Sequence, residues 1–318
     1  MISVIRVATI VSAVVLTLTA SIRLASAAGP QVAYVSATGN DGDVECPPAS
    51  PCASIGIAIN SVAPGGEVVC LSPPLAVEGG FAFSQSVTVD CAGTYFASGS
   101  MVLSGVNQTV IFRHVNFDGS SMAAPGPGIE LTGSGSLVLE NCSFENFAGA
   151  PAIEITPSGA LKVGLTNDRI SNSGSGVMLR PNLGFSSQSM PDSTQATLDH
   201  VTITDNSGGG IHADSTNASI TVDVFDSNIS GNLINGIIAI AGASQNIVSI
   251  KNSVIARNGQ AGVVANGANA SALVQTTLLD QNAAGATSVV NGGNLFTYGN
   301  NSIVGLQGSG FTATVGLQ

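Results

Sequence analysis

The feature that most constrains the fold of this chain is a repeat that recurs between residues 146 and 282. Each copy runs from a β-branched residue through a polar turn with an asparagine to a small residue, usually glycine, and then into an apolar strand. The intervals between the marker asparagines are 26, 34, 26, 26 and 24 residues, for Asn146, Asn172, Asn206, Asn232, Asn258 and Asn282. The longer interval contains extra residues in the polar stretch 184–195. A fixed period in the mid-twenties predicts a solenoid, in which each repeat buries its apolar face against its neighbours.

Runs of strand length lie between these turns and alternate apolar with polar residues, as in LVLENCSF (137–144) and SITVDVF (219–225). Such alternation predicts β-strands. At about 4.8 Å between neighbouring strands, the stretch 93–318 would hold roughly nine coils of about 25 residues. We therefore expect an all-β, parallel solenoid. The marker asparagines are expected to stack along one turn as a ladder of side-chain amide hydrogen bonds, rather than to bind a ligand.

The first 27 residues are typical of a secretory signal peptide. Arg6 precedes the apolar run 7–22, and the small residues before Ala27 form a cleavage site, so cleavage is expected after Ala27. The alternative is an uncleaved membrane anchor, although this run is shorter than the about 20 residues that span a bilayer. We expect the mature chain to be secreted, periplasmic or attached to the cell surface, with no membrane span.

The cysteines fit an oxidising compartment. Cys46 and Cys52 lie close together, and Cys70 and Cys91 flank a predicted strand pair. The simplest pairing is therefore Cys46 with Cys52 and Cys70 with Cys91. Cys142 is left over within a strand pattern, and a buried, structural role is expected for it because buried cysteine commonly acts as a small apolar residue.

Charge is sparse and acidic. Charged residues are 8% of the chain, against about 25% in typical soluble domains, and the net charge is −11. An acidic chain without a basic patch is a poor partner for nucleic acid or an anionic membrane surface. Acidic polysaccharides would need a cation to mediate their contact with it.

Residues 28–92 differ from the repeats and are expected to form an N-terminal cap, leaving 93–318 for the solenoid. A short strand is predicted at Val32–Val35 and a helix at Ser54–Asn60, which Pro64 would end. An open solenoid exposes its end layer, so a helix carrying Ile55, Ile57, Ile59 and Val62 is expected to cover that layer.

The string YVSATGN…PCAS…AIN…PGGEVVC…SVTVDCAGT resembles the N-terminal region of secreted bacterial β-helix proteins with the pectin-lyase-like fold. With the repeats and the C-terminal TYGNNSI, the resemblance extends over nearly the whole mature chain. It implies a right-handed parallel β-helix with an N-terminal capping helix. It implies no particular reaction, because many members of this group have none assigned.

A candidate site follows from the alternation of the strands after the repeated glycines. If Ile153 and its equivalents point inward, the next residues point outward, and so do the residues two further on. Five ionisable side chains then share one outward face: Glu130, Glu154, Arg180, His212 and Asp214. The carboxylates Glu130 and Glu154 would act as an acid/base pair, Arg180 would bind a substrate carboxylate and His212 would move a proton. The alternative is an ordinary cross-strand ion pair beside two solvated glutamates.

The signature residues of well-known enzymes with this fold are missing. No two aspartates are adjacent, as they are in polygalacturonases, and the Arg-x-Pro-x-x-Arg of pectate lyases is absent. We therefore favour a non-catalytic surface or structural protein that binds a polysaccharide or a cell-envelope glycan. The outward residues Ile238, Ile240 and Val264 would add an apolar contact patch. The alternative is a polysaccharide lyase or glycoside hydrolase that acts on an extracellular polysaccharide and uses the five residues above.

No cofactor is expected, with one weaker alternative. Asp41, Asp43 and Glu45 lie close together in a polar loop and could bind Ca²⁺ through carboxylate oxygens. An acidic, solvated loop is the simpler interpretation. The three histidines are scattered in the sequence and lack metal-ligand spacing.

Overall fold

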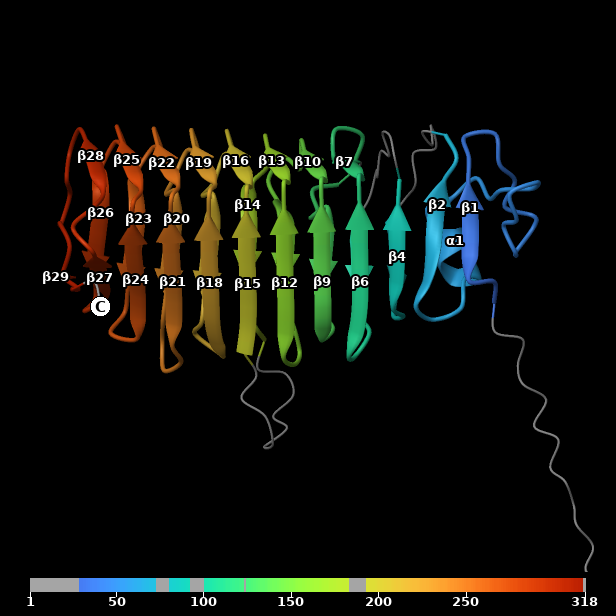
Figure 1. The fold of residues 1–318 in the computed structure, drawn as a ribbon, viewed down its shortest axis with the longest axis horizontal. Coiled ribbons are helices and arrows are strands. Elements are labelled where there is room, and N and C mark those ends of the chain that lie inside the picture. Colours follow the sequence, from blue (N-terminus) through green and yellow to red (C-terminus); the bar gives the residue numbers. More distant parts are fainter. Residues whose placement is uncertain (1–28, 73–79, 92–99, 123, 183–192, 317–318) are drawn as a thin grey trace, which may run out of the picture.

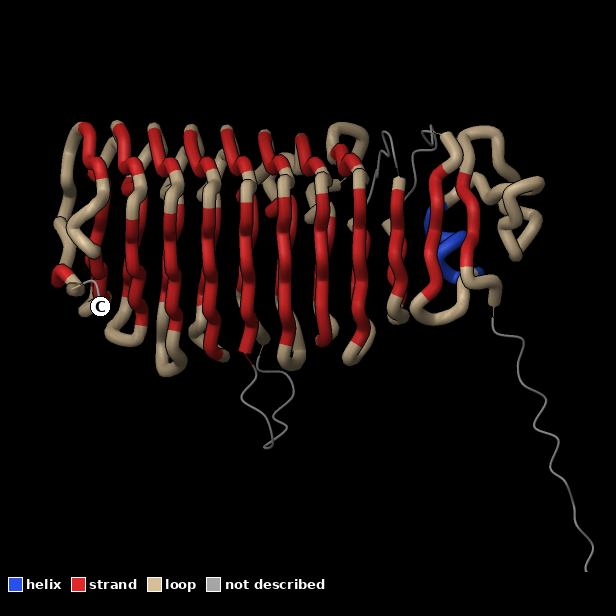
Figure 2. Tube along the Cα trace, viewed as in Figure 1, coloured by secondary structure: helices blue, strands red, loops and turns tan. Residues whose placement is uncertain are grey.

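The structure is a computed structural model that describes residues 29–72, 80–91, 100–122, 124–182 and 193–316. This part of the chain winds into a rod of stacked coils, with one short helix near its N-terminal end (Figure 1). The coils contribute strands to three parallel sheets, and turns join one sheet to the next (Figure 2). The predicted signal peptide, residues 1–27, lies outside the described residues.

The three sheets contain twelve, eight and nine strands, and neighbouring strands pair in parallel. The twelve-stranded sheet consists of β1 (Val32–Val35), β2 (Gly66–Cys70), β4 (Val87–Asp90), β6 (Gln108–Arg113), β9 (Gly135–Glu140), β12 (Leu161–Thr166), β15 (Ser193–Asp199), β18 (Ser219–Phe225), β21 (Asn246–Lys251), β24 (Ala270–Gln275), β27 (Asn294–Thr297) and β29 (Ala313–Thr314). The eight-stranded sheet consists of β7 (Asn116–Asp118), β10 (Ser143–Glu145), β13 (Arg169–Ser171), β16 (Thr202–Thr204), β19 (Asn228–Ser230), β22 (Val254–Ala256), β25 (Leu278–Asp280) and β28 (Ser302–Val304). The nine-stranded sheet consists of β3 (Phe81–Phe83), β5 (Met101–Leu103), β8 (Ile129–Leu131), β11 (Pro151–Ile155), β14 (Ser175–Leu179), β17 (Ile211–Asp214), β20 (Ile237–Ile240), β23 (Ala261–Asn266) and β26 (Gly285–Val290).

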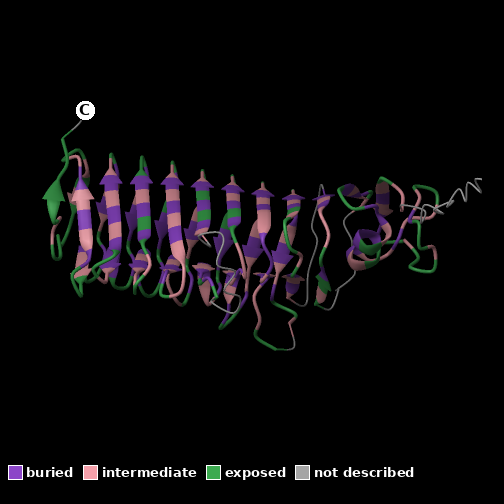
Figure 3. Cartoon of the chain, turned by 90° about the horizontal axis from the view of Figure 1, so that it is seen from below, coloured by how far each residue is buried: buried purple, intermediate pink, exposed green. Residues whose placement is uncertain are grey.

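The core lies inside the rod, because successive side chains of a strand point to opposite faces of its sheet. Buried and partly exposed residues therefore alternate along the strands (Figure 3). Equivalent residues of neighbouring coils stack on one another in the core. Phe117 and Phe144 are such a pair, with parallel rings whose centroids are 4.4 Å apart. Both rings are almost fully buried, and each such burial stabilises the fold by about 2–3 kcal/mol.

A short helix, α1 (Ile55–Ser61), covers the N-terminal end of the rod and packs against β1, β2 and β3. Ile55, Ala58 and Ile59 are buried on its inner face. The predicted helix is thereby confirmed, but Ile57, one of the residues expected to cover the end layer, is instead 38% exposed. A helical period of 3.6 residues turns Ile57 away from the face that carries Ile55 and Ile59.

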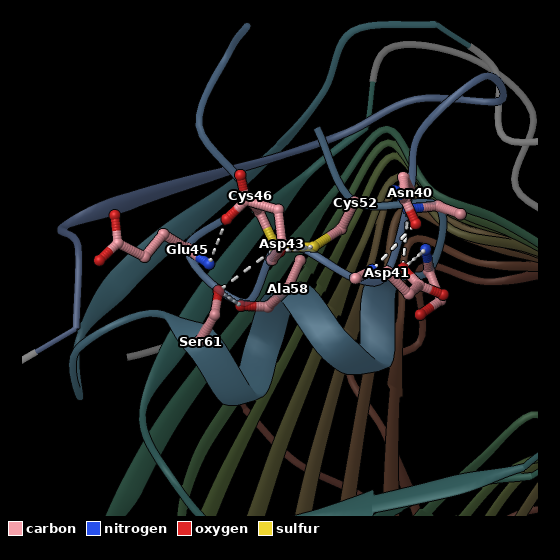
Figure 4. Close-up of a disulfide and its surroundings, with 11 residues drawn as sticks. Asn40, Asp41, Asp43, Glu45, Cys46, Cys52, Ala58 and Ser61 are labelled. Carbon is pink, nitrogen blue, oxygen red and sulfur yellow. Dashed lines mark hydrogen bonds between the residues drawn. A yellow bond between two sulfur atoms is a disulfide. The ribbon is translucent and has the colours of Figure 1, made fainter. Parts of the chain in front are cut away.

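Both predicted disulfides are present in this N-terminal part. Cys46 bonds to Cys52 and Cys70 bonds to Cys91, with Cα atoms 4.9 and 4.7 Å apart. The first bridge lies directly against α1, where the Ser61 hydroxyl is 3.6 Å from the sulfur of Cys46 (Figure 4). Cys142 is a free, buried thiol, as expected. The bridges therefore tie the cap together and leave the later coils without covalent links among the described residues.

Four of the marker asparagines form the predicted ladder at the turn between the eight-stranded and nine-stranded sheets. The Nδ2 of Asn206 donates to Oδ1 of Asn232 at 2.9 Å, and Asn232 donates in the same way to Asn258 at 3.0 Å. Asn258 continues the series to Asn282 at 2.9 Å. Each accepting Oδ1 also receives the backbone N–H of the preceding asparagine. All four side chains are buried, and the ladder supplies their hydrogen bonds.

Asn146 and Asn172 do not belong to this ladder, so that part of the prediction is wrong. They lie one residue earlier in their coils, where Phe147 and Ser173 hold the ladder position. Both asparagines adopt a left-handed backbone, with φ of 66° and 52°, as Gly231 does with φ of 68° two coils beyond Asn172. Asparagine tolerates this conformation better than most residues. The two asparagines therefore provide the left-handed backbone of the turn and do not take part in the ladder.

Candidate functional site

The outer face of the nine-stranded sheet carries the five predicted site residues. In the strand register Glu130 is paired with Glu154, and Met178 is paired with His212. Ile153, the residue before Glu154, is fully buried, whereas both glutamates are partly exposed. The predicted inward and outward faces are therefore confirmed for these strands.

Arg180 and Asp214 form an ion pair on neighbouring coils. The Nε atom of Arg180 lies 3.7 Å from one carboxylate oxygen of Asp214, and the two side chains are 47% and 19% exposed. The other carboxylate oxygen accepts hydrogen bonds from the backbone N–H and the hydroxyl of Thr216 at 3.0 and 2.5 Å. Asp214 is therefore held in place, and the partly exposed side chain of Arg180 lies beside it.

His212 lies in β17 two residues before Asp214, on the same face. Burial lowers the pKa of His212 below its ordinary value, the Arg180 guanidinium lowers it further, and Asp214 partly opposes the change. The imidazole is therefore neutral near pH 7. Its Nε2 atom is buried and has no hydrogen-bond partner among the residues that the structure describes. A ligand or substrate would have to approach the ring from its other, Nδ1 side.

The five residues do not form a single cluster. Glu130 and Glu154 lie on β8 and β11, and Met178 separates Glu154 from His212 along the outward column. Within the part of the chain that the structure describes, no ion pair shorter than 4.0 Å joins either glutamate to Arg180. The face thus carries two separate polar groups, a pair of glutamates and the cluster of Arg180, His212 and Asp214, which we call the arginine–histidine–aspartate cluster.

Apolar side chains continue the same face beyond His212. Ile238 is paired with His212, and Ile240 with Asp214, and both isoleucines are partly exposed. The prediction that Val264 extends this patch is wrong, because its side chain is only 6% exposed. A contact surface on these coils therefore consists of the polar cluster, Met178 and the two isoleucines.

The acidic loop before the first disulfide uses its side chains to hold the backbone. One carboxylate oxygen of Asp41 accepts the backbone N–H groups of Ala53 and Ser54 at 2.8 and 2.9 Å, at the start of α1 (Figure 4). A carboxylate oxygen of Asp43 accepts the N–H of Glu45 at 3.1 Å. Asp41, Asp43 and Glu45 are not among the described groups whose ligand atoms converge. A Ca²⁺ site in this loop stays a prediction.

One group of potential metal ligands was missed by the sequence reasoning. Asp199, His200 and Asp226 place one ligand atom each within 4.8 Å of the others. The three histidines are scattered in the sequence, but His200 and Asp226 occupy the same turn position in consecutive coils. The signal was available in the sequence: their separation of 26 residues equals the repeat period.

A cavity of about 370 Å³ lies beside the turn between β10 and β11. Its lining residues include Met122 and Pro125, which follow β7, together with Asn146 and Asn172. None of the five predicted site residues lines this cavity. It is therefore a feature separate from the outer face of the nine-stranded sheet.

Comparisons with known proteins identify the fold. The structure is similar to that of the pectate lyase Pel9A, with a TM-score of 0.56 and 16% sequence identity over 89% of this chain and 78% of that one. It is also similar to a rhamnogalacturonan lyase, with a TM-score of 0.52 and 12% identity over 83% of this chain and 75% of that one. No protein-family model and no curated protein sequence matches the chain.

The chain therefore has the right-handed parallel β-helix of the pectin-lyase-like fold, with a helical cap at its N-terminal end. At these identities the similarity concerns the fold alone. No helix among the described residues is long and apolar enough to cross a membrane. The two disulfides fit an extracellular protein.

Proposed function

We propose that this protein binds an extracellular polysaccharide on the outer face of the nine-stranded sheet. The observation that carries the proposal is the arginine–histidine–aspartate cluster, which gathers three of the few ionisable residues of the chain beside partly exposed apolar side chains. Arg180 would donate hydrogen bonds to sugar oxygens or to a carboxylate. Met178 and Ile238 would contact the apolar faces of the sugar rings.

The rod shape supports this proposal. Parallel strands about 4.8 Å apart present equivalent side chains at regular intervals, so an extended polymer can contact several coils at once. The two structurally similar proteins are named as lyases of pectate and of rhamnogalacturonan, which are both polysaccharides. The acidic balance of the chain favours neutral or weakly charged polymers over polyanions.

Binding can be tested with a panel of neutral and acidic extracellular polysaccharides, using isothermal titration calorimetry. We expect at least one polysaccharide to bind with micromolar or tighter affinity, and Arg180→Ala to weaken this binding at least about tenfold, or about 1.4 kcal/mol. Arg169→Ala is the matched control, because Arg169 is also exposed and pairs with Glu145 at 3.3 Å, but lies on the eight-stranded sheet. Absence of binding across the panel, or equal losses in the two variants, would contradict the proposal.

A second candidate function is eliminative cleavage of a uronate polysaccharide, which the neutral imidazole beside Arg180 favours. Arg180 would hold the uronate carboxylate, and His212 would take the proton from the adjacent ring carbon. The electron pair left behind would form a carbon–carbon double bond as the glycosidic carbon–oxygen bond breaks. The imidazolium or water would return a proton to the leaving oxygen.

The two candidates differ in their products. A lyase would generate unsaturated uronate ends, which absorb ultraviolet light, and His212→Ala would reduce their rate at least about 100-fold. A glycoside hydrolase that uses Glu130 and Glu154 would instead release reducing ends without unsaturation, and Glu154→Gln would abolish this release. Binding without either product supports the non-catalytic function.

A further inference from the structure

We infer that Asp199, His200 and Asp226 form a binding site for a divalent transition-metal ion such as Zn²⁺ on the outside of the rod. The site lies at the turn that leads from the twelve-stranded to the eight-stranded sheet. It is therefore on a different face from the proposed polysaccharide surface and does not depend on it.

The backbone fixes the relative positions of the three residues. Asp199 ends β15 and is paired with Phe225, the last residue of β18, so that His200 and Asp226 follow at equivalent positions on consecutive coils. Both have a left-handed backbone, with φ of 56° and 48°. The backbone N–H groups of His200 and Asp226 donate to the next coil at 3.2 and 3.1 Å. The strand ladder on each side therefore holds this turn in place.

The side-chain geometry fits a common metal ion. Nδ1 of His200 lies 2.7 Å from one carboxylate oxygen of Asp199, and one ligand atom from each of the three residues lies within 4.8 Å of the others. Ligand atoms that bind one Zn²⁺ at about 2.1 Å are at most about 4.2 Å apart. Small rotations of exposed side chains are therefore enough to bring all three onto one ion.

The charges and donor types select the class of ion. Among the described residues, the only ion-pair contact within 4.0 Å that involves these three is the one between His200 and Asp199. The two carboxylates thus have no arginine or lysine partner. A hard cation such as Ca²⁺ prefers oxygen ligands alone, whereas an imidazole with carboxylates suits Zn²⁺, Ni²⁺ or Cu²⁺.

A second histidine in the same turn column provides a natural comparison. His114 also contacts an aspartate, with its Nδ1 3.0 Å from a carboxylate oxygen of Asp90. The next coil places Asn141, not an acid, at the equivalent turn position. The residue before His114, at the position equivalent to Asp199, is Arg113, which pairs with Glu140 at 2.6 Å and supplies no metal ligand. His114 thus has the aspartate contact without the third ligand.

The test is a Zn²⁺ titration of the purified, tag-free protein by isothermal titration calorimetry, with the melting temperature followed in parallel. We expect one Zn²⁺ per chain at this site and a higher melting temperature, because the ion binds only the folded arrangement. His200→Ala and Asp226→Asn should each weaken binding at least about tenfold, since even the loss of residues around a metal ligand commonly costs 10–100-fold. His114→Ala should leave the affinity unchanged.

Other outcomes overturn the inference. Failure of the wild-type protein to bind Zn²⁺ below millimolar concentration would do so, and so would unchanged affinity in His200→Ala. An excess of Ca²⁺ should not displace Zn²⁺. Displacement by equimolar Ca²⁺ would show that the imidazole is not a ligand. Polysaccharide binding is expected to be the same in His200→Ala, so the two proposals fail independently.

Discussion

Asp168 and Cys142 occupy equivalent positions on neighbouring coils, and the Asp168 carboxylate accepts a hydrogen bond from the backbone N–H of Cys142 at 2.7 Å. Asp168 is 2% exposed. Its other carboxylate oxygen accepts the N–H of Thr166 at 3.0 Å. Burial raises the pKa of Asp168 to about 7, although both hydrogen bonds act in the opposite direction. A carboxyl group inside the turn is thus protonated over a pH range in which an exposed one is ionised.

We predict that Asp168→Asn stabilises the protein above pH 7. The pKa of Asp168 is about 7 in the folded chain and about 3.9 in an unfolded one. The protonated Asp168 carboxyl therefore makes its full contribution to the free energy of unfolding below about pH 4. This contribution, up to about 4 kcal/mol, is lost as the pH rises to about 7. Asparagine suits this position, because Asn301 holds it at the C-terminal end and its amide makes hydrogen bonds of 2.9 and 2.8 Å.

The measurement is the melting temperature of the wild type and the variant at pH 5 and pH 8. Between pH 5 and pH 8 the melting temperature should fall less for Asp168→Asn than for the wild type. Asp205→Asn changes an exposed aspartate at another turn, so its melting temperature should fall between the two pH values as much as that of the wild type. Equal losses in the wild type and in Asp168→Asn would contradict the prediction.

The asparagine ladder predicts unequal effects at two asparagines that look alike in the sequence. Asn232→Ala removes the oxygen that accepts the backbone N–H and the Nδ2 of Asn206 at 3.2 and 2.9 Å. Two buried donors are then left without a partner, which should cost about 2–4 kcal/mol of stability. Asn172→Gly should cost little, because Asn172 is exposed and glycine readily adopts its left-handed backbone. Urea unfolding followed by circular dichroism measures both changes.

The small residues before the strands of the nine-stranded sheet are packed against the next coil. A Cβ atom on Gly236 would lie 2.6 Å from the carbonyl oxygen of Gly262 and from a methyl group of Ile255. We predict that Gly236→Ala destabilises the protein by about 1–3 kcal/mol, because the neighbours must shift. Gly164→Ala is the control, since no heavy atom lies within 4 Å of its Cβ position, and it should be neutral or slightly stabilising. The urea midpoint should fall for Gly236→Ala and should not fall for Gly164→Ala.

Reduction of the disulfides should loosen the cap before the coils. Cys46–Cys52 and Cys70–Cys91 both lie before residue 92, and each is expected to contribute about 2–4 kcal/mol. Stability in a solenoid is approximately a sum over neighbouring units, so loss of the bridges acts locally. Limited proteolysis of the reduced protein should first cut within residues 29–91. Early cleavage among the central coils, with the cap intact, would contradict this expectation.

The free thiol should be inert in the folded protein. Burial raises the pKa of Cys142 to about 12, and the Asp168 carboxylate adds to the effect. Since the thiolate is the reactive form, we predict that a thiol reagent modifies the native protein very slowly and the unfolded protein rapidly. The measurement is the rate of modification with and without denaturant. Rapid modification of the native protein would show that Cys142 is accessible.

The sequence alone determined the class of fold and much of the outer face of the nine-stranded sheet. The repeat period required a solenoid, and the alternation of residues placed Ile153 inside and Glu154 outside. Once the period and the alternation are known, equivalent residues of successive coils must be neighbours. That is why Arg180 and Asp214 were expected on one outward face, where the structure places them 3.7 Å apart. The spacing of the cysteines likewise pointed to the pairing that the structure contains.

The tertiary structure alone decided which of two adjacent turn positions each residue takes. Asn172 and Asn206 look equivalent in the sequence, but the strand register places one on the surface in a left-handed turn and the other in the buried ladder. Because the repeats vary in length, the sequence does not show whether an asparagine is shifted by one residue along its turn. Such a shift nevertheless decides whether the side chain is exposed or buried. Burial in turn sets the charge state of Asp168, and the stacking of coils brings His200 next to Asp226. The period of the repeat brings His200 and Asp226 to equivalent positions, but burial and charge state depend on contacts between coils that the period does not specify.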